Sequence, residues 1–369
     1  MFISCGQQDF FRAVQIVNRA VSARTTMPIL SNILLESVEE GLRLTATDLE
    51  LGIQTFVAAT VEEGGAITLP ARLLSEIAAS LPQARVQLRV EHEANRAEIQ
   101  CEETVFEILG LPAADFPLLP APEVTEAISL EASLLRGMIR QTVFAVSTDE
   151  TRPFLTGVHV VVEDRTVRFV ATDGGRLSLR CATLDQAVRQ KFGVIVPAKT
   201  MHELARLATG AAGAVAMALA ENHLVFTLPE ARLVSRLIAG QFPNYEQVIP
   251  QGFKQRLRLQ TERFLRAVRR AAITARDSAN VVRLSARGSE LTITSNTPEV
   301  GKTVERLPVD AEGETVEIAF NARYLMDCLS VLEADEVTFE LSGPLSPGAI
   351  RPVGQQDYVY VLAPVRVYA

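Results

Sequence analysis

Apolar and polar positions along the chain repeat with a period of about 125 residues, roughly a third of its length. Three segments open alike, each with an acidic or helix-capping residue followed by apolar residues at helical spacing: residues 9–14, 133–138 and 262–268. In the first segment, apolar side chains from Phe10 to Val21 mark one face of a helix. The pattern therefore predicts three copies of a unit that contains a helix near its start.

A stretch of alternating apolar and polar residues follows each predicted helix. These stretches are residues 42–51, 167–177 and 291–300, and a period of two is typical of half-buried strands. Each is predicted to turn at a polar residue whose side chain bonds its own backbone. The three turn residues are Asp48, Asp173 and Asn296.

The second half of each third repeats as well. Residues 67–77, 194–204 and 318–329 each predict a strand, a short break and a helix. Two of these helices are predicted to begin at Pro70 and Pro197, because a proline in the first turn of a helix costs no hydrogen bond. Each third thus predicts helix, strands, helix and strands, and the similarity of its halves suggests six copies of one small unit.

Proline-rich stretches separate the thirds. Residues 113–120 and 239–250 share a Phe-Pro pair, at Phe116 and Phe242, and such stretches are natural linkers. A chain of 369 residues is also too long for one ordinary core. The predicted fold class is α+β, with three similar domains of two helices packed on β-sheets. Their predicted boundaries are residues 1–121, 122–250 and 251–369.

Cations recur at equivalent positions of the predicted helices, off the apolar stripe of each helix. On the first and then the second helix of each third they are Arg12, Arg136, Arg266, Arg72, Lys199 and Arg323. If the six helices turn this side the same way, it forms a basic surface that can follow a phosphate backbone. The alternative is six ordinary solvated helix faces.

The overall charge argues against binding to a phosphate backbone, because the chain has 36 basic and 44 acidic residues and a net charge of −8. A simple nucleic-acid binder is usually basic. The acidic excess lies in the first third, however, since residues 122–250 and 251–369 are balanced. No aromatic residues lie between the helix cations and no recognition helix is evident, so any nucleic-acid contact is predicted to ignore sequence.

Catalytic motifs are missing from the sequence. The four cysteines form no closely spaced pair, the four histidines lack metal-ligand spacing, and no dinucleotide-binding or nucleophile motif occurs. We therefore expect no metal, no cofactor and no catalytic residue. Two alternatives stay open: an unrecognised nuclease or transferase that uses Asp48, Asp149 and Asp173, and a repeat scaffold that binds only proteins.

The longest apolar stretch, residues 210–220, is too short to cross a membrane. The start of the chain also lacks the basic and apolar regions of a secretory signal. Unpaired cysteines are typical of a reducing compartment. We expect a soluble, cytoplasmic protein with no membrane partner.

Several longer motifs resemble one family from end to end of the chain. They include Arg24-Thr-Thr-Met-Pro-Ile-Leu near the start, Ala171-Thr-Asp-Gly-Gly-Arg-Leu in the middle and Leu362-Ala-Pro-Val-Arg at the end. Between them stand Leu111-Pro-Ala-Ala-Asp-Phe-Pro and Ile195-Val-Pro-Ala-Lys. With these motifs in this order, the chain resembles the bacterial DNA polymerase III beta subunit family, the DNA sliding clamps.

The resemblance implies a DNA clamp fold, in which two chains close head to tail into a six-domain ring with helices inside and sheets outside. Twelve helices at ~9 Å spacing leave a hole of roughly 25 Å, enough for a duplex. The implied function is a non-catalytic processivity factor that encircles double-stranded DNA. Implied partners are a second copy, the DNA polymerase III alpha subunit, the clamp loader complex, and other polymerases, mismatch-repair proteins and ligase through short peptide motifs.

The resemblance also carries over residues for DNA contact and for peptide binding. Arg24 and Lys199 match family positions that touch DNA. Asp149 stands where the family has another contact, although an acidic side chain is a departure there. The partner-peptide groove maps onto Leu155, Thr172, Gly174, Arg176, Leu177, Pro243, Val248, Tyr324, Val361, Pro364, Val365 and Arg366.

The implied dimer seam joins an edge strand of the first domain to a helix of the third, because an exposed edge invites pairing. The strand spans residues 104–109, and the seam residues are Phe106, Ile108, Arg270, Ile273 and Thr274. Departures from the family occur at Gly175, where relatives often carry histidine, and at Ala363 and Val365, where methionine is common.

Overall fold

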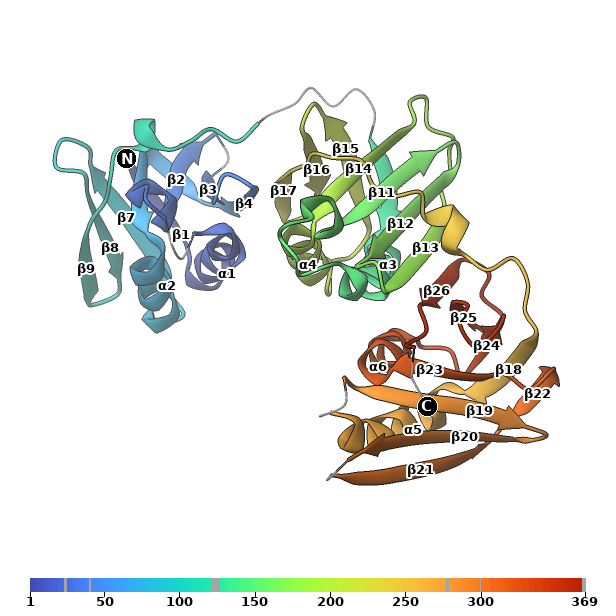
Figure 1. The fold of residues 1–369 in the computed structure, drawn as a ribbon. Helices are drawn as coiled ribbons and strands as arrows, with labels where there is room; N and C mark the ends of the chain where they lie inside the picture. Colours follow the sequence, from blue (N-terminus) through green and yellow to red (C-terminus); the bar gives the residue numbers. More distant parts are fainter. Residues whose placement is uncertain (23–24, 40, 121–126, 277–278, 299, 367–369) are drawn as a thin grey trace. The chain divides into compact units, whose positions relative to one another are not determined.

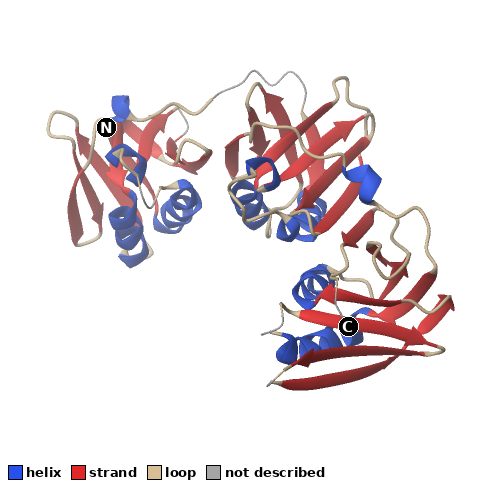
Figure 2. Cartoon of the chain, in the orientation of Figure 1, coloured by secondary structure: helices blue, strands red, loops and turns tan. Residues whose placement is uncertain are grey.

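The structure is a computed structural model that describes residues 1–22, 25–39, 41–120, 127–276, 279–298 and 300–366 (Figure 1). Arg24 lies outside the described residues. The chain forms two compact units, one of residues 1–136 with 199–237 and one of residues 137–198 with 238–369. Figure 2 shows helices and strands in every third of the chain. No helix among the described residues has the length and apolar character needed to span a membrane.

Each third contains two α-helices and eight or nine strands in the part of the chain that the structure describes. The first third holds β1 (Phe2–Gly6), α1 (Gln7–Val17), β2 (Asn32–Val38), β3 (Gly41–Thr47), β4 (Leu51–Ala58), β5 (Thr60–Glu63), β6 (Ala66–Pro70), α2 (Ala71–Ser80), β7 (Arg85–Glu91), β8 (Arg96–Cys101) and β9 (Thr104–Leu109). The second third holds β10 (Ile128–Glu131), α3 (Ala132–Thr142), β11 (Gly157–Glu163), β12 (Thr166–Thr172), β13 (Arg176–Thr183), β14 (Phe192–Pro197), α4 (Ala198–Leu207), β15 (Ala214–Ala220), β16 (His223–Thr227) and β17 (Ala231–Arg236).

The last third holds β18 (Gln255–Gln260), α5 (Thr261–Ala275), β19 (Val281–Arg287), β20 (Glu290–Thr297), β21 (Gly301–Pro308), β22 (Asp310–Gly313), β23 (Glu317–Asn321), α6 (Ala322–Val331), β24 (Glu336–Leu341), β25 (Gly348–Pro352) and β26 (Tyr358–Leu362). Short 3₁₀ turns occur at Asn18–Ala20, Pro28–Ser31, Ala113–Asp115, Val143–Ala145, Pro153–Leu155 and Tyr245–Val248.

The predicted order of helix, strands, helix and strands is confirmed, but each third begins one element earlier than predicted. Strands β1, β10 and β18 precede the first helices, so every half of a third begins strand, helix, strands. β10 and β18 alternate buried and less buried residues along four and six residues. The signal was therefore present, but it was short.

The first helix packs through the apolar stripe that the sequence predicts. On α1, Phe10, Ala13, Val14 and Val17 are buried, whereas Arg12 is exposed. Burying a large apolar side chain contributes about 1.5–3 kcal/mol. The stripe thus holds the helix in place and turns the cation toward solvent.

In the first compact unit, one sheet runs across the boundary between the first and second thirds. Its strand order is β10-β15-β16-β17-β4-β3-β2-β6. The crossing point is the antiparallel ladder between β17 and β4, from Ala231↔Thr55 to Ser235↔Leu51. A second sheet has the order β5-β1-β7-β8-β9 and leaves β9 at its edge.

The second compact unit repeats this arrangement between the second and last thirds. Its large sheet has the order β14-β11-β12-β13-β26-β25-β24-β18-β22. Here β13 pairs with β26, from Arg176↔Leu362 to Arg180↔Tyr358. The smaller sheet, β21-β20-β19-β23, leaves β21 at its edge. In each compact unit, the last strand of one third of the chain (β17 or β26) therefore pairs with a strand of the preceding third (β4 or β13). Within its own third, β4 or β13 is strand number three after the first helix.

The predicted turn at Asn296 is wrong. Asp48 and Asp173 each follow the last paired residue of a strand, as predicted, at Thr47↔Gly52 and Thr172↔Leu177. Asn296 instead pairs with Lys302 inside the β20–β21 ladder. The ladder extends further in this third, so the polar residue falls within the strand.

Candidate functional site

The turn aspartates are held by local hydrogen bonds. Asp48 Oδ1 accepts from the backbone N–H of Glu50 at 3.0 Å and of Leu51 at 2.7 Å. Asp173 Oδ1 accepts from the backbone N–H of Gly175 at 2.8 Å and of Arg176 at 3.0 Å. Both follow the predicted pattern of a side chain that closes its own turn. Their carboxylates are engaged in structure, and the described residues contain no cluster of three or more potential metal ligands.

The six predicted helix cations are all exposed to solvent. Four of them nevertheless make ion pairs within the chain: Arg12 with Glu230 at 2.5 Å, Arg72 with Glu76 at 3.0 Å, Lys199 with Asp48, and Arg266 with Glu262. Arg136 and Arg323 form no ion pair with another described residue. The positive charge on the helices is therefore partly balanced. Spacing along the sequence is enough to predict the pairs of Arg72 and Arg266, whose partners lie four residues away on the same helix, but not those of Arg12 and Lys199.

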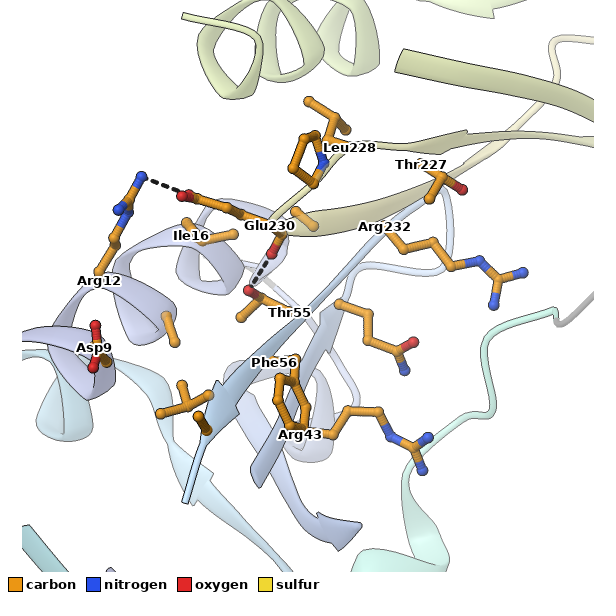
Figure 3. Close-up of a pocket in the computed structure, with 16 residues that line it drawn as sticks. Asp9, Arg12, Ile16, Arg43, Thr55, Phe56, Thr227, Leu228, Glu230 and Arg232 are labelled. Atoms are coloured by element: carbon orange, nitrogen blue, oxygen red, sulfur yellow. Dashed lines mark hydrogen bonds and ion pairs between the residues drawn. The ribbon is translucent and has the colours of Figure 1, made fainter. Parts of the chain in front are cut away.

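Arg12 lies at a pocket of about 490 Å³ where the first and second thirds meet (Figure 3). It extends from α1 to Glu230, which stands in the turn between β16 and β17. The backbone oxygen of Glu230 also accepts a hydrogen bond from Thr55 Oγ1 at 2.5 Å. This cation therefore attaches the hairpin of the second third to the first third.

Asp149 caps its own loop. It accepts hydrogen bonds from the Thr151 hydroxyl, from the Thr151 backbone N–H at 3.0 Å and from Arg152 Nε at 3.0 Å. These contacts, the Thr151 hydroxyl first, hold the pKa of the Asp149 carboxyl below its usual value. The side chain is thus a loop anchor and remains negatively charged.

Arg176 is the centre of a mostly buried cluster in the second compact unit. Its Nε donates to Asp173 Oδ2 at 3.0 Å, its Nη1 to Asp327 Oδ2 at 2.5 Å and its Nη2 to the Phe144 oxygen at 2.8 Å. The guanidinium carbon lies 4.4 Å from the centre of the Tyr324 ring. Arg176 thus links the second third to α6 of the last third.

The predicted peptide-groove residues divide into a buried set and an accessible set. Leu155, Leu177 and Val361 are buried in one apolar cluster with Phe242 and Tyr245. Thr172 is also buried, and its hydroxyl donates to the Arg176 oxygen at 2.6 Å. The accessible set consists of residues that are at least partly exposed to solvent: Gly174, Pro243, Val248, Tyr324, Pro364, Val365 and Arg366.

The end of the described chain is held beside these residues by two backbone hydrogen bonds. The N–H of Ala363 donates to Gly175 O at 2.9 Å, and the N–H of Val365 donates to Ala319 O at 2.8 Å. A Cβ at Gly175 would lie 3.1 Å from the ring of Tyr324. The glycine therefore lets the ring approach the turn closely.

On the first-third side of the predicted seam, the accessible residues differ from those expected. Phe106 is partly exposed and Ile108 is buried in this chain. Val105 and Leu109, on the same edge strand β9, are 51% and 73% exposed. Reading the family motif alone missed them, although two large apolar residues on an edge strand were a usable signal.

On the last-third side, Arg270 and Thr274 bind within the chain. Arg270 donates to both carboxylate oxygens of Glu305 on β21, at 2.8 and 2.6 Å, and this holds the pKa of Glu305 below its usual value. The Thr274 hydroxyl lies 2.6 Å from Ser295 Oγ and 2.8 Å from Thr303 Oγ1. These contacts fasten α5 to its sheet and leave Ile273 60% exposed.

Comparisons with known proteins cover the whole chain. Models of the DNA polymerase III beta subunit match residues 1–120 (N-terminal domain), 129–244 (central domain) and 246–366 (C-terminal domain). The beta sliding clamp of Bacillus subtilis is 38% identical over 367 residues, 96% of this chain and 97% of its own length. The beta sliding clamp of Synechococcus elongatus is 35% identical over an alignment of 374 positions, which covers 100% of each chain.

Solved structures agree. The crystal structure of the DNA polymerase sliding clamp from Bacillus subtilis has a TM-score of 0.96 and 37% identity, over 100% of both chains. The sliding clamp of Pseudomonas aeruginosa bound to griselimycin has a TM-score of 0.95 and 33% identity, again over 100% of both chains.

Three consecutive α+β domains that match the beta subunit models, together with the structural match over the whole chain, define a clamp of the three-domain type. The predicted fold class is confirmed. The chain belongs to the DNA polymerase III beta subunit family, so the predicted resemblance is confirmed too. It is a DNA sliding clamp of DNA polymerase III and a non-catalytic processivity factor, and the interpretation as an unrecognised nuclease or transferase is wrong.

Proposed function

We propose that two copies of this chain close head to tail into a cytoplasmic ring of six domains around double-stranded DNA. The domains are residues 1–121, 122–250 and 251–369. The ring tethers the polymerase and slides without reading sequence.

The observation that carries this proposal is the repeated contact between consecutive thirds. Inside the chain, β17 pairs with β4 and β26 pairs with β13. β9 holds the place of β17 and β26 in the first third, and β21 holds the place of β4 and β13 in the last third. Both are sheet edges in the described chain. Pairing of β9 with β21 of a second copy would repeat the same contact twice and close a ring.

The exposed apolar side chains support this seam. Val105 and Leu109 extend from β9, and Val304 on β21 is 46% exposed. Unpaired edges with apolar side chains are templates for another chain. Ile273 adds an exposed apolar residue on α5, the helix fastened to β21 by Arg270 and Glu305.

The helix cations support the DNA contact. All six are exposed, and cations on helices attract phosphates regardless of base sequence. Carboxylate partners of four of them limit the attraction, which suits a ring that must move along the duplex. With Arg24, the proposed contacts are Arg12, Arg72, Arg136, Lys199, Arg266 and Arg323.

Accessible apolar residues of the second compact unit support a site for short apolar peptides. Pro243, Val248, Pro364 and Val365 are at least partly accessible, and their sequence neighbours Phe242, Tyr245 and Val361 are buried in one apolar cluster. The proposed ligands are peptide segments of the DNA polymerase III alpha subunit, the clamp loader complex, other polymerases, mismatch-repair proteins and ligase. An aromatic ring and prolines give a rigid surface on which an apolar side chain can bind.

A release experiment tests the ring. Labelled protein is loaded onto nicked circular DNA with a clamp loader and ATP, and the circle is then cut once. Retention on the circle and loss after cutting support a topological link. Retention on linear DNA would overturn the ring, because ordinary binding does not depend on free ends.

A further inference from the structure

The second helix of each third carries a cation at its second residue and a carboxylate at its sixth. The cations are Arg72, Lys199 and Arg323, and the carboxylates are Glu76 on α2, Glu203 on α4 and Asp327 on α6. Residues four apart on a helix can form an ion pair. The structure therefore contains three copies of one potential pair.

In α4 and α6, the carboxylate pairs with a cation of the preceding third, although Glu203 also accepts a hydrogen bond from Arg206 of its own helix at 3.0 Å. Arg19 Nη1 lies 3.5 Å from Glu203 Oε2, and Arg176 Nη1 lies 2.5 Å from Asp327 Oδ2. Lys199 pairs with Asp48, and Arg323 forms no ion pair with another described residue. At both internal boundaries the helix cation is thus released from the carboxylate of its own helix.

Helix α2 is the exception. Arg72 Nε donates to Glu76 Oε1 at 3.0 Å, and both side chains are well exposed, Arg72 at 93% and Glu76 at 63%. No third precedes α2 within one chain. In a closed ring, the last third of a second copy would take that place.

The last third offers cations at the matching place. Ile273 lies seven residues after Arg266, as Arg19 lies seven residues after Arg12, so Ile273 holds the place of Arg19. Arg269 on α5 lies four residues before Ile273, and Arg276, the C-cap residue of α5, lies three residues after it. Both are exposed, and neither forms an ion pair with another described residue.

We propose that ring closure transfers Glu76 from Arg72 to Arg269 and Arg276 of the second copy. Glu76 then stabilises the seam as Glu203 and Asp327 stabilise the internal boundaries. Arg72 loses its helix partner and becomes available to phosphate only in the closed ring. This inference rests on the proposed function, because it requires the head-to-tail dimer.

A double-mutant cycle on the dimer tests the transfer. The dimer dissociation constant is measured by sedimentation for the wild type, Glu76→Gln, the pair Arg269→Gln/Arg276→Gln, and all three changes together. Glu76→Gln is expected to raise the constant about 2- to 5-fold per seam at low salt, because an exposed ion pair contributes modestly. It is expected to add little when the arginines are already replaced. Additive effects would overturn the transfer.

Arg72→Gln is the matched control, because it breaks the same α2 ion pair by removing the cation instead of the carboxylate. It is expected to leave the dimer equal to or tighter than the wild type, because Glu76 is then free before closure. A loss equal to that of Glu76→Gln would also overturn the transfer. A wild-type chain that stays monomeric at every concentration would instead overturn the ring, so the two failures are distinguishable.

Discussion

Arg176 on β13 and Asp327 on α6 lie 2.5 Å apart between Nη1 and Oδ2, although they stand 151 residues apart in the sequence. The same guanidinium also holds Asp173 and lies over Tyr324. One side chain thus joins a turn of the second third, a helix of the last third and the aromatic ring of the proposed peptide site.

Arg176→Ala is expected to lower the free energy of unfolding by about 2–4 kcal/mol. It leaves Asp173 without its cation in a mostly buried setting, while Asp327 regains water. Urea unfolding measures the change. The control is Arg258→Ala, whose pair with Glu336 is more exposed and should cost less than about 1 kcal/mol. Equal losses for both variants would contradict a special role for Arg176.

His159 is expected to make stability depend on pH. Burial, with repulsion from Arg168, lowers its pKa to about 4, whereas an unfolded histidine titrates near 6.5. The unfolded chain therefore binds more protons between these values, and the contribution of neutral His159 is lost as pH falls from 6.5 toward 4. His159→Phe, which can keep the stacking on Phe242, should remove about 1–2 kcal/mol of this loss.

Urea unfolding at pH 7 and at pH 4.5 measures this difference between wild type and variant. His202→Gln is the control for replacing a histidine at an exposed site, on α4. The same pH dependence in His159→Phe as in the wild type would contradict the assignment to this ring.

Ile273→Glu is expected to yield monomers. A carboxylate at an apolar seam would lose its water when the seam closes, which should raise the dimer dissociation constant at least about 100-fold. Sedimentation measures the constant. Leu345→Glu makes the same change at a 63% exposed site on the β24–β25 turn and should leave the dimer intact. A stable Ile273→Glu dimer would show that the seam lies elsewhere.

Removal of residues 365–369 is expected to abolish binding of polymerase peptides without changing the dimer. The deletion takes away Val365, whose N–H holds the chain to Ala319, and leaves β26 complete. Fluorescence anisotropy with a labelled peptide of the polymerase alpha subunit measures the loss. Retained affinity would place the peptide on another surface.

Arg323→Gln is expected to weaken DNA loading more than Arg266→Gln. Arg323 forms no ion pair with another described residue, whereas the charge of Arg266 is balanced by Glu262 on the same helix. The amount of ring loaded on nicked circles, followed from low to high salt, measures both effects. Equal losses would mean that the local carboxylate does not screen Arg266 from DNA.

Much of the fold could be predicted because its signals are local and repeated. The apolar stripe of α1, the strands β3 and β12 and the turn aspartates follow from short stretches of sequence. The expectation that these strands are half-buried is wrong, because β3 and β12 are buried at most of their residues. The prediction of a turn at Asn296 was wrong because the β20–β21 ladder is longer than expected and includes this residue as a paired strand position. Strand pairing is not encoded by spacing alone.

The candidate site was less predictable, because its partners come from distant parts of the chain. The sequence spacing predicted that Arg12 and Lys199 lie at exposed helix positions. It could not predict their ion pairs with Glu230 and Asp48, because these carboxylates belong to neighbouring thirds. Likewise, the family motif named Ile108, whereas tertiary packing buries it and exposes Leu109. Ion pairs and accessible faces depend on which elements become neighbours.

The β17–β4 ladder joins the first two thirds by backbone hydrogen bonds, independently of the peptide link between them. In the proposed ring, equivalent contacts would follow one another in a circular series. A circularly permuted chain, with residues 127–369 followed through a short linker by residues 1–120, would keep all six domains in the same order around the ring. Its non-covalent junctions would be the β17–β4 ladders, while the β9–β21 seams would become covalently tethered.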